Sequence, residues 1–379
     1  MEPSDGGAIP HGTEEVHPQQ PQEPFIQNLE RFQYESLDQS RPCIRLLRLL
    51  GEWEKPEVPA CEIFHVNDWP PNATQHSYEA LSYSWGSPNK NRTASVNGKA
   101  LVITENLYWA LYHLRIGDQS RTLWIDAICI DQSNLSEKSH QVGFMGEIFS
   151  CSHRVIFWLG NPDADSDLAM RFLEDEEART SQEVKSKLTW DKLDVQTWEV
   201  KQSLEKLLRR QWFYRVWIIQ EVIKARSAVF ACGKYCVQVD TFRGTFDLKQ
   251  GWFHVHPLLE TAPGASGRSL TAMSLYFALN YFRDHEATDE RDKIFALLGV
   301  ISPKLAIEPD YAKSDKEVAR EVFALLGKPR EEDLVDAPNS VSELIYGLRN
   351  CRWRHLEAYY NTNDPTEYER LAYLQYSGP

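Results

Sequence analysis

The sequence of 379 residues has none of the short glycine motifs that mark the common phosphate-binding and hydrolytic folds. It contains no Gly-x-x-x-x-Gly-Lys-Ser/Thr phosphate loop and no Gly-x-Gly-x-x-Gly dinucleotide turn. The segment Gly264-Ala-Ser-Gly267 is not the Gly-x-Ser-x-Gly of a nucleophile elbow. These absences argue against a P-loop nucleotidase, a Rossmann dehydrogenase and an α/β-hydrolase.

Long apolar runs and positive charge are also scarce. No run of 18 apolar residues exists, so we expect no transmembrane helix. The 41 Lys and Arg residues face 55 Asp and Glu residues, which gives a net charge of −14. Because nucleic acid and anionic membranes would repel such a chain, we expect neither as a partner.

Cysteine is present but scattered. Of the seven cysteines only Cys232 and Cys236 lie close together, and no second Cys/His pair stands at the spacing of a zinc site. His254-x-His256 has no acidic or Cys partner nearby. Small residues in a hairpin are the favoured interpretation of the Cys pair, so we expect no metal and no bound cofactor. Since no signal-peptide pattern is present, we expect reduced thiols and a cytoplasmic location.

What the chain does have is a large stock of core-forming residues: 42% are hydrophobic and 12% aromatic, with twelve Trp. Residues 1–24 are rich in Pro, Gly, Gln and Glu, which predicts a disordered tail. We expect one domain over residues 25–325. Within it, residues 161–210 turn acidic and then mixed-charge with helical spacing, which indicates a helical insertion. Residues 326–379 are expected to form a C-terminal helical extension.

The core is predicted by an alternation of segment types between residues 78 and 160. Apolar strand-like runs cover 78–85, 123–130 and 154–159, and helical spacing separates them. Asn134-Leu-Ser-Glu137 resembles a capping box at the start of the second helix. This alternation favours an α/β fold with a mostly parallel sheet flanked by helices.

Further strands and helices are expected around this core. Asn97-Gly98 and Gly233-Lys234 each lie between apolar runs, which is typical of a β-hairpin turn. Additional strands are expected near residues 44–49 and 61–64. Further helices are expected over 210–224, in most of 269–300 and over 314–327.

A first candidate site is Leu81-Ser-Tyr-Ser-Trp-Gly86, at the expected carboxyl end of a strand. In open α/β sheets, ligands bind outside the carboxyl ends of strands. The Ser84 hydroxyl, the Trp85 ring and the Gly86 backbone would suit a nucleotide or a sugar. The alternative is an aromatic strand that simply ends in a glycine turn.

A second candidate is the acidic pair Asp126 and Asp131. Asp126 lies within the apolar run 123–130, where a buried carboxylate is costly unless it is hydrogen-bonded or paired. It would either contact a ligand or accept structural hydrogen bonds, and the structural role is favoured. Asp131 follows the run and is better placed to face a crevice.

The third candidate is Glu221. Phe213, Trp217 and Glu221 are spaced four apart, so they would share one helix face. A carboxylate on an aromatic stripe is desolvated, which raises its pKa and suits acid/base work. The alternative is that the aromatic residues are core and that Glu221 pairs with Arg215, Arg154 or another Arg.

Taken together, several blocks of this sequence resemble the heterokaryon incompatibility (HET) domain of filamentous fungi. The match covers residues 40–325 in the order expected of the family. Its blocks are Tyr78–Gly86, Leu123–Gln132, the helix with Gln141-Val142, Arg154–Gly160, Trp212–Glu221, Asp289–Gly299 and Pro309–Tyr311. Phe149 and Ser152 stand where the family usually has Tyr and Ala.

The resemblance implies a cytosolic effector of nonself recognition that triggers programmed cell death. HET domains are also distantly similar to TIR domains, which have a flavodoxin-like fold and include NAD-cleaving enzymes. By that similarity Trp217-x-x-x-Glu221 corresponds to the TIR helix that carries the catalytic Glu. About 50 residues (161–210) precede this helix here, whereas TIR domains reach it within a few residues.

Two activities are therefore expected as alternatives, and the enzyme assignment is left open. In the first, the domain cleaves the nicotinamide–ribose bond of NAD as a substrate: Glu221 holds the ribose hydroxyls and stabilises the oxocarbenium-like transition state. Trp85 and Trp217 would pack against rings, while Ser84, Gly86 and Asp131 would contact phosphate or ribose. In the second, the domain is a non-catalytic module that recruits protein partners or self-assembles.

Overall fold

The computed structural model describes residues 29–51, 58–67, 69–70, 77–87, 89–181, 198–245, 255–263, 274–302, 306–326 and 337–349. The predicted tail over residues 1–24 and most of the predicted extension over 326–379 lie outside these residues, as does His254.

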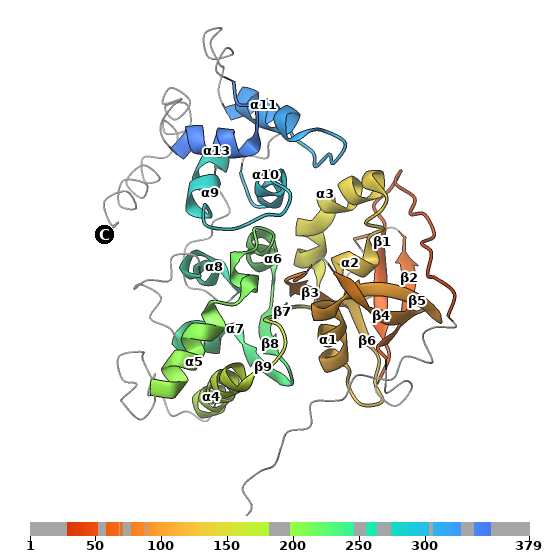
Figure 1. Cartoon of the computed structure of the whole chain (residues 1–379), viewed down its shortest axis with the longest axis vertical. Helices are drawn as coiled ribbons and strands as arrows, with labels where there is room; N and C mark the ends of the chain where they lie inside the picture. The colour runs from red at the N-terminus through yellow and green to blue at the C-terminus, as the bar shows by residue number, and fades with distance from the viewer. Residues whose placement is uncertain are drawn as a thin grey trace, which may run out of the picture.

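One nine-stranded sheet organises the fold (Figure 1). Its strand order is β5-β4-β2-β1-β6-β3-β7-β8-β9. The strands are β1 (Ile44–Leu49), β2 (Ala60–Val66), β3 (Glu79–Tyr83), β4 (Lys90–Val96), β5 (Lys99–Thr104), β6 (Arg121–Trp124), β7 (Arg154–Trp158), β8 (Ala228–Cys232) and β9 (Tyr235–Gln238). The sheet is mixed: β6, β3, β7 and β8 run parallel, and antiparallel strands flank them.

The helices cover both faces of the parallel centre and extend beyond it. They are α1 (Glu105–Leu114), α2 (Asp126–Cys129), α3 (Leu135–Cys151), α4 (Ala164–Ser181), α5 (Trp198–Leu208), α6 (Ile218–Lys224), α7 (Val239–Thr245), α8 (His256–Thr261), α9 (Leu275–Tyr281), α10 (Asp292–Leu298), α11 (Asp315–Leu326) and α13 (Val341–Arg349). A short 3₁₀ helix covers Gln211–Tyr214. The expectation of an α/β fold with a parallel core, added hairpins and flanking helices is confirmed.

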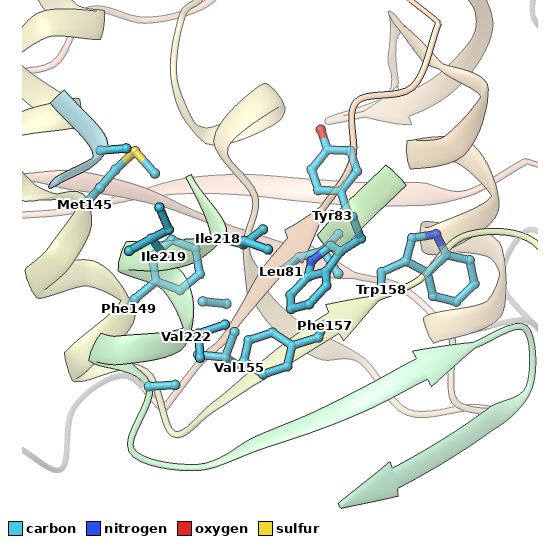
Figure 2. Packing of buried hydrophobic residues seen from close by; sticks show 14 of the residues in the cluster. Leu81, Tyr83, Met145, Phe149, Val155, Phe157, Trp158, Ile218, Ile219 and Val222 are labelled. Atoms are coloured by element: carbon cyan, nitrogen blue, oxygen red, sulfur yellow. The ribbon is translucent and has the colours of Figure 1, made fainter. Parts of the chain in front are cut away.

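The core forms where α3 and α6 pack on the centre of the sheet. Figure 2 shows Met145 and Phe149 of α3 meeting Ile219 and Val222 of α6 over Val155 of β7. All five side chains are buried. Such burial, at roughly 25 cal/mol per Å² of apolar surface, is what holds these helices against the sheet.

Both predicted hairpins form. Asn97 (φ 49°) and Gly98 (φ 73°) connect β4 to β5 with two left-handed residues, the geometry of a type I′ turn. Gly233 (φ 56°) connects β8 to β9. The predicted start of α3 is also correct, because the Asn134 side chain accepts a hydrogen bond from the Glu137 amide at 3.2 Å.

Two predicted boundaries are wrong. The expected strand over 123–130 ends at Trp124, and Asp126 begins the single turn α2 because the amides of Ile128 and Cys129 bond to the Ile125 carbonyl. The expected helix over 210–224 is split between the 3₁₀ helix and α6. Arg215 is extended between them because Val216 and Tyr214 exchange backbone hydrogen bonds with Glu286. Phe213 therefore does not share a helix face with Glu221.

The range 161–210 contains α4 and α5, which pack against each other. No helix within the described residues is long and apolar enough to cross a membrane.

Candidate functional site

The candidate site lies where β3, β6 and β7 end. Because these strands are parallel, their carboxyl ends meet at one edge of the sheet. The loop Ser84–Ser87 follows β3, the turn α2 follows β6, and Leu159–Asp163 follows β7. The predicted residues Ser84, Trp85 and Gly86 lie in the first of these loops.

Ser84 and Gly86 shape the loop after β3. The Ser84 hydroxyl donates to Gln211 Oε1 at 3.0 Å, and the Ser84 carbonyl accepts from Asn106 Nδ2 at 2.6 Å. Gly86 has φ +70°, a left-handed conformation that favours glycine. Ser84 is buried, so its hydroxyl supports the loop in this conformation.

The Trp85 side chain is hydrogen-bonded to Asp126. The Trp85 ring is 37% exposed, and its indole N–H donates to Asp126 Oδ2 at 2.9 Å. Asp126 Oδ1 also accepts from the Ala127 amide at 2.7 Å. Burial raises the pKa of Asp126, while the Arg215 guanidinium and these hydrogen bonds oppose the rise. The favoured interpretation of Asp126 as an acceptor of structural hydrogen bonds agrees with this geometry.

Glu221 is buried behind β3, only 3% exposed. Its Oε2 accepts a hydrogen bond from the Ser82 hydroxyl, which in turn accepts from Trp212 Nε1 at 2.8 Å. Arg215 Nη1 lies 3.8 Å from the same carboxylate oxygen and donates to the Tyr83 carbonyl. Desolvation raises the pKa of Glu221 from 4.5 to about 7, against the opposing effects of Arg215 and Ser82.

We call Asp126, Arg215 and Glu221 the carboxylate cluster. The Arg215 charge lowers the pKa of both carboxyl groups, and the Asp126 charge raises that of Glu221. One guanidinium cannot neutralise two carboxylates, so near neutral pH the cluster can hold a proton on Glu221. A buried carboxyl that exchanges a proton near pH 7 is suited to acid/base work.

The side chains of Asp131 and Trp217 hydrogen-bond to residues outside the carboxylate cluster. Asp131 Oδ1 accepts from the amide and hydroxyl of Ser133 at 3.0 and 2.6 Å, which makes a local turn. Trp217 is half-buried at the start of α6, and its side chain hydrogen-bonds to Asp292. Burial raises the pKa of Asp292, and the hydrogen bonds from Tyr311 and Trp217 oppose the rise. Of the six predicted site residues, the structure therefore gathers Ser84, Trp85, Gly86 and Glu221 around the end of β3.

Arg215, one of the partners expected for Glu221, does pair with it. Arg154, the other alternative, instead pairs with Glu79 at 2.5 Å, at the amino end of β3. The contribution of Ser82 was missed. Its signal was a hydroxyl within an otherwise apolar strand, two residues before Ser84.

A pocket of about 450 Å³ opens next to the loop after β3. Its lining residues are Ser87, Asn89, Asn91, Glu105, Asn106 and Asn161. Glu221 is not among them. The two features are linked through β3: Asn106 bonds to Ser84, and Glu221 bonds to Ser82.

The two neighbouring cysteines, Cys232 and Cys236, are not bonded to each other. Cys232 is buried, and its thiol lies 3.4 Å from the Gly160 carbonyl; Cys236 is exposed two residues beyond the turn. Both are free thiols. Within the described part of the chain, no group of three His, Cys, Asp or Glu residues is arranged to hold a metal ion.

Comparisons with known proteins agree on one family. Residues 78–221 match the family model described as heterokaryon incompatibility protein (HET). The heterokaryon incompatibility protein 6, OR allele, of Neurospora crassa is 28% identical over 358 aligned positions, which cover 75% of this chain. The chain spans about half (51%) of the length of that relative. No solved structure gives a significant match.

Proposed function

We propose that this chain, which carries a heterokaryon incompatibility domain at residues 78–221, is a fungal effector of nonself recognition that triggers programmed cell death. The family match and the name of the Neurospora relative support this role. We place the protein in the cytoplasm and expect its partners to be other proteins or further copies of itself.

For the chemistry, we propose that the domain cleaves NAD. Water would replace nicotinamide at the ribose carbon, so that the glycosidic C–N bond breaks and ADP-ribose, nicotinamide and a proton are released. Glu221 would bind the ribose hydroxyls and stabilise the positive charge that develops on the sugar. The observation that carries this proposal is a buried carboxyl with a pKa of about 7 behind the end of a central parallel strand.

The topology of the sheet supports the same proposal. Numbered along the chain, β3, β6, β7 and β8 are the first to fourth parallel strands, and their spatial order is 2-1-3-4. Flavodoxin-like sheets share this order and bind their ligands where the first and third strands end. TIR domains, the analogy behind the proposed activity, belong to that fold group.

A second candidate function is a non-catalytic assembly module. It is favoured by the burial of Glu221, which is 3% exposed and already satisfied by Ser82 and Arg215. On the catalytic proposal, substrate binding or assembly must open this cluster, and the exposed Trp85 is the side chain that covers its Asp126 end.

The test is nicotinamide release from NAD by the purified chain, alone and under crowding or forced oligomerisation. We expect release in the assembled state and a loss of at least about 100-fold in Glu221→Gln, because the charge that stabilises the transition state is removed. Release that survives this substitution would refute the mechanism. No release in any assembled state would favour the assembly module.

Glu79→Gln is the matched control. Glu79 lies on β3, the strand that carries Ser82, but at its amino end, where it pairs with Arg121 and Arg154. This substitution weakens the fold without touching the carboxylate cluster. Activity should fall in Glu221→Gln and persist in the folded fraction of Glu79→Gln.

A further inference from the structure

The pocket beside Ser84–Ser87 occupies the position where this sheet topology places ligands. Ser87 follows β3 and Asn161 follows β7, so the pocket lies between the carboxyl ends of the first and third parallel strands. The connections from these strands leave in different directions, which opens a crevice at that point. Asn106, in the first turn of α1, lies between the two loops.

The framework of the pocket is fixed by hydrogen bonds between its walls. Asn106 donates to the Ser84 carbonyl at 2.6 Å and accepts from Trp158 Nε1 at 3.0 Å, so one carboxamide ties β3 to β7. Arg210 Nη1 donates to the carbonyls of Leu159 and Asn161 at 3.0 and 2.7 Å. A ligand would therefore meet loops that are already held in place, which lowers the cost of binding.

The lining side chains have an unusual chemistry. Four of the six are asparagine carboxamides and one is a serine hydroxyl, groups that both donate and accept hydrogen bonds. The remaining residue, Glu105, forms an ion pair with Arg92 at 2.7 Å and also accepts a hydrogen bond from the Asn91 side chain, which leaves the Asn91 carbonyl oxygen for a ligand. No lining residue is a cation that would bind phosphate, and none is aromatic and able to stack a base. The pocket thus favours a ligand that is uncharged and rich in hydroxyl groups.

We propose that this pocket binds an uncharged sugar, recognised through vicinal hydroxyls by Asn89, Asn91 and Asn161. A carboxamide donates to one hydroxyl of such a pair and accepts from its neighbour. A volume of about 450 Å³ falls within the range of small-ligand pockets and accommodates a monosaccharide unit. This binding requires no chemistry at Glu221 and no phosphate contact, so on the proposed NAD cleavage the phosphates and bases of NAD would lie outside this pocket.

The test uses methyl β-D-ribofuranoside as the probe, titrated against the full chain labelled with ¹⁵N. We expect saturable shifts of the asparagine side-chain NH₂ signals that Asn→Leu substitutions assign to Asn89, Asn91 and Asn161. Asn161→Leu and Asn89→Leu keep the side-chain size but remove the polar groups. Each should weaken binding by about tenfold, the value of one or two lost hydrogen bonds.

Three controls make the result decisive. Asn339→Leu, at an exposed position near the start of α13, should bind the probe like the unmodified chain. The 2-deoxy analogue of the probe should bind about tenfold more weakly, because one hydroxyl of the vicinal pair is missing. Ribose 5-phosphate should bind no more tightly than the neutral probe.

Two results would overturn the proposal. The first is that the shifts do not saturate. The second is that the shifts are unchanged in both asparagine variants while those variants keep their thermal melting temperatures. Tighter binding of ribose 5-phosphate would overturn the assignment of an uncharged ligand. Failure of nicotinamide release, by contrast, would affect only the proposed NAD cleavage.

Discussion

At the scale of single residues, the protein is distinguished by a carboxyl group that is both buried and close to its titration point. Glu221 accepts from Ser82 and faces Arg215, yet desolvation still raises its pKa to about 7. Asp126, which is half-buried, adds a second carboxyl group whose pKa is raised by desolvation. The folded chain therefore holds a proton that the unfolded chain has already released at mildly acidic pH.

This linkage predicts how stability depends on pH. The unfolded carboxyl has a pKa of 4.5 and the folded one about 7, so the free energy of unfolding falls as pH rises through that window. Glu221→Gln removes the titration. Relative to the unmodified chain, its stability should rise by up to about 3 kcal/mol between pH 4.5 and 7.

Urea denaturation of both proteins across this pH range measures the difference. A difference that stays constant with pH would mean that Glu221 is charged throughout and fully compensated by Arg215. Asp126 is retained in both proteins, but its charge is coupled to that of Glu221, so the comparison reports the titration of the pair.

At the scale of elements, the two hairpin glycines offer a matched pair of turns. Both are left-handed, with φ +73° at Gly98 and +56° at Gly233. A Cβ at Gly98 would meet nothing within 4 Å, whereas one at Gly233 would lie 2.9 Å from Pro162. A side chain at Gly98 would therefore strain only the backbone conformation, whereas a side chain at Gly233 would also clash with Pro162.

Replacement by alanine separates these two causes. Gly98→Ala should lower the free energy of unfolding by about 1 kcal/mol, the cost of a left-handed non-glycine residue. Gly233→Ala should cost about 3 kcal/mol, because overpacking against Pro162 is added. Equal losses, measured by urea denaturation of the two variants, would contradict the packing argument.

At the scale of the whole molecule, the sheet is open and its two edges must be protected. The β5 edge is covered by residues 30–32, which exchange backbone hydrogen bonds with Ala100. The β9 edge is covered by α4 instead. Its glutamates accept from the edge amides, Glu174 from Cys236 at 3.2 Å and Glu177 from Gln238 at 2.9 Å. Carboxylates on these amides keep another strand from pairing there.

Removing both carboxylates should therefore promote self-association. We expect Glu174→Ala/Glu177→Ala to form dimers or larger species in multi-angle light scattering at concentrations where the unmodified chain does not. The double variant should also lose about 2 kcal/mol of stability. Asp175→Ala, at an exposed position on the same helix, is the control. An unchanged mass in the double variant would show that α4 does not guard this edge.

Much of the fold was predictable because it depends on local patterns. Asn97-Gly98 specifies a type I′ turn without help from the rest of the chain, and Asn134 caps α3 through an amide three residues away. Of the two boundaries that failed, the one at Ile125 depends on a single local turn within an apolar run, and the one at Arg215 depends on a distant contact. At Arg215 the pairing partner is Glu286, about 70 residues away, so no local pattern reveals it.

The sequence by itself determined the parallel α/β core, the hairpins and the family resemblance, because periodicity, turn residues and motif order are properties of the chain alone. Only the tertiary structure decided which side chains meet. Asp126 comes from one segment and Arg215 and Glu221 from another, about 90 residues later, and the proton affinity of the two carboxyls follows from desolvation and from their distance to Arg215. The asparagine pocket likewise exists only because β3 and β7 become neighbours, which brings residues 87 and 161 to one edge of the sheet.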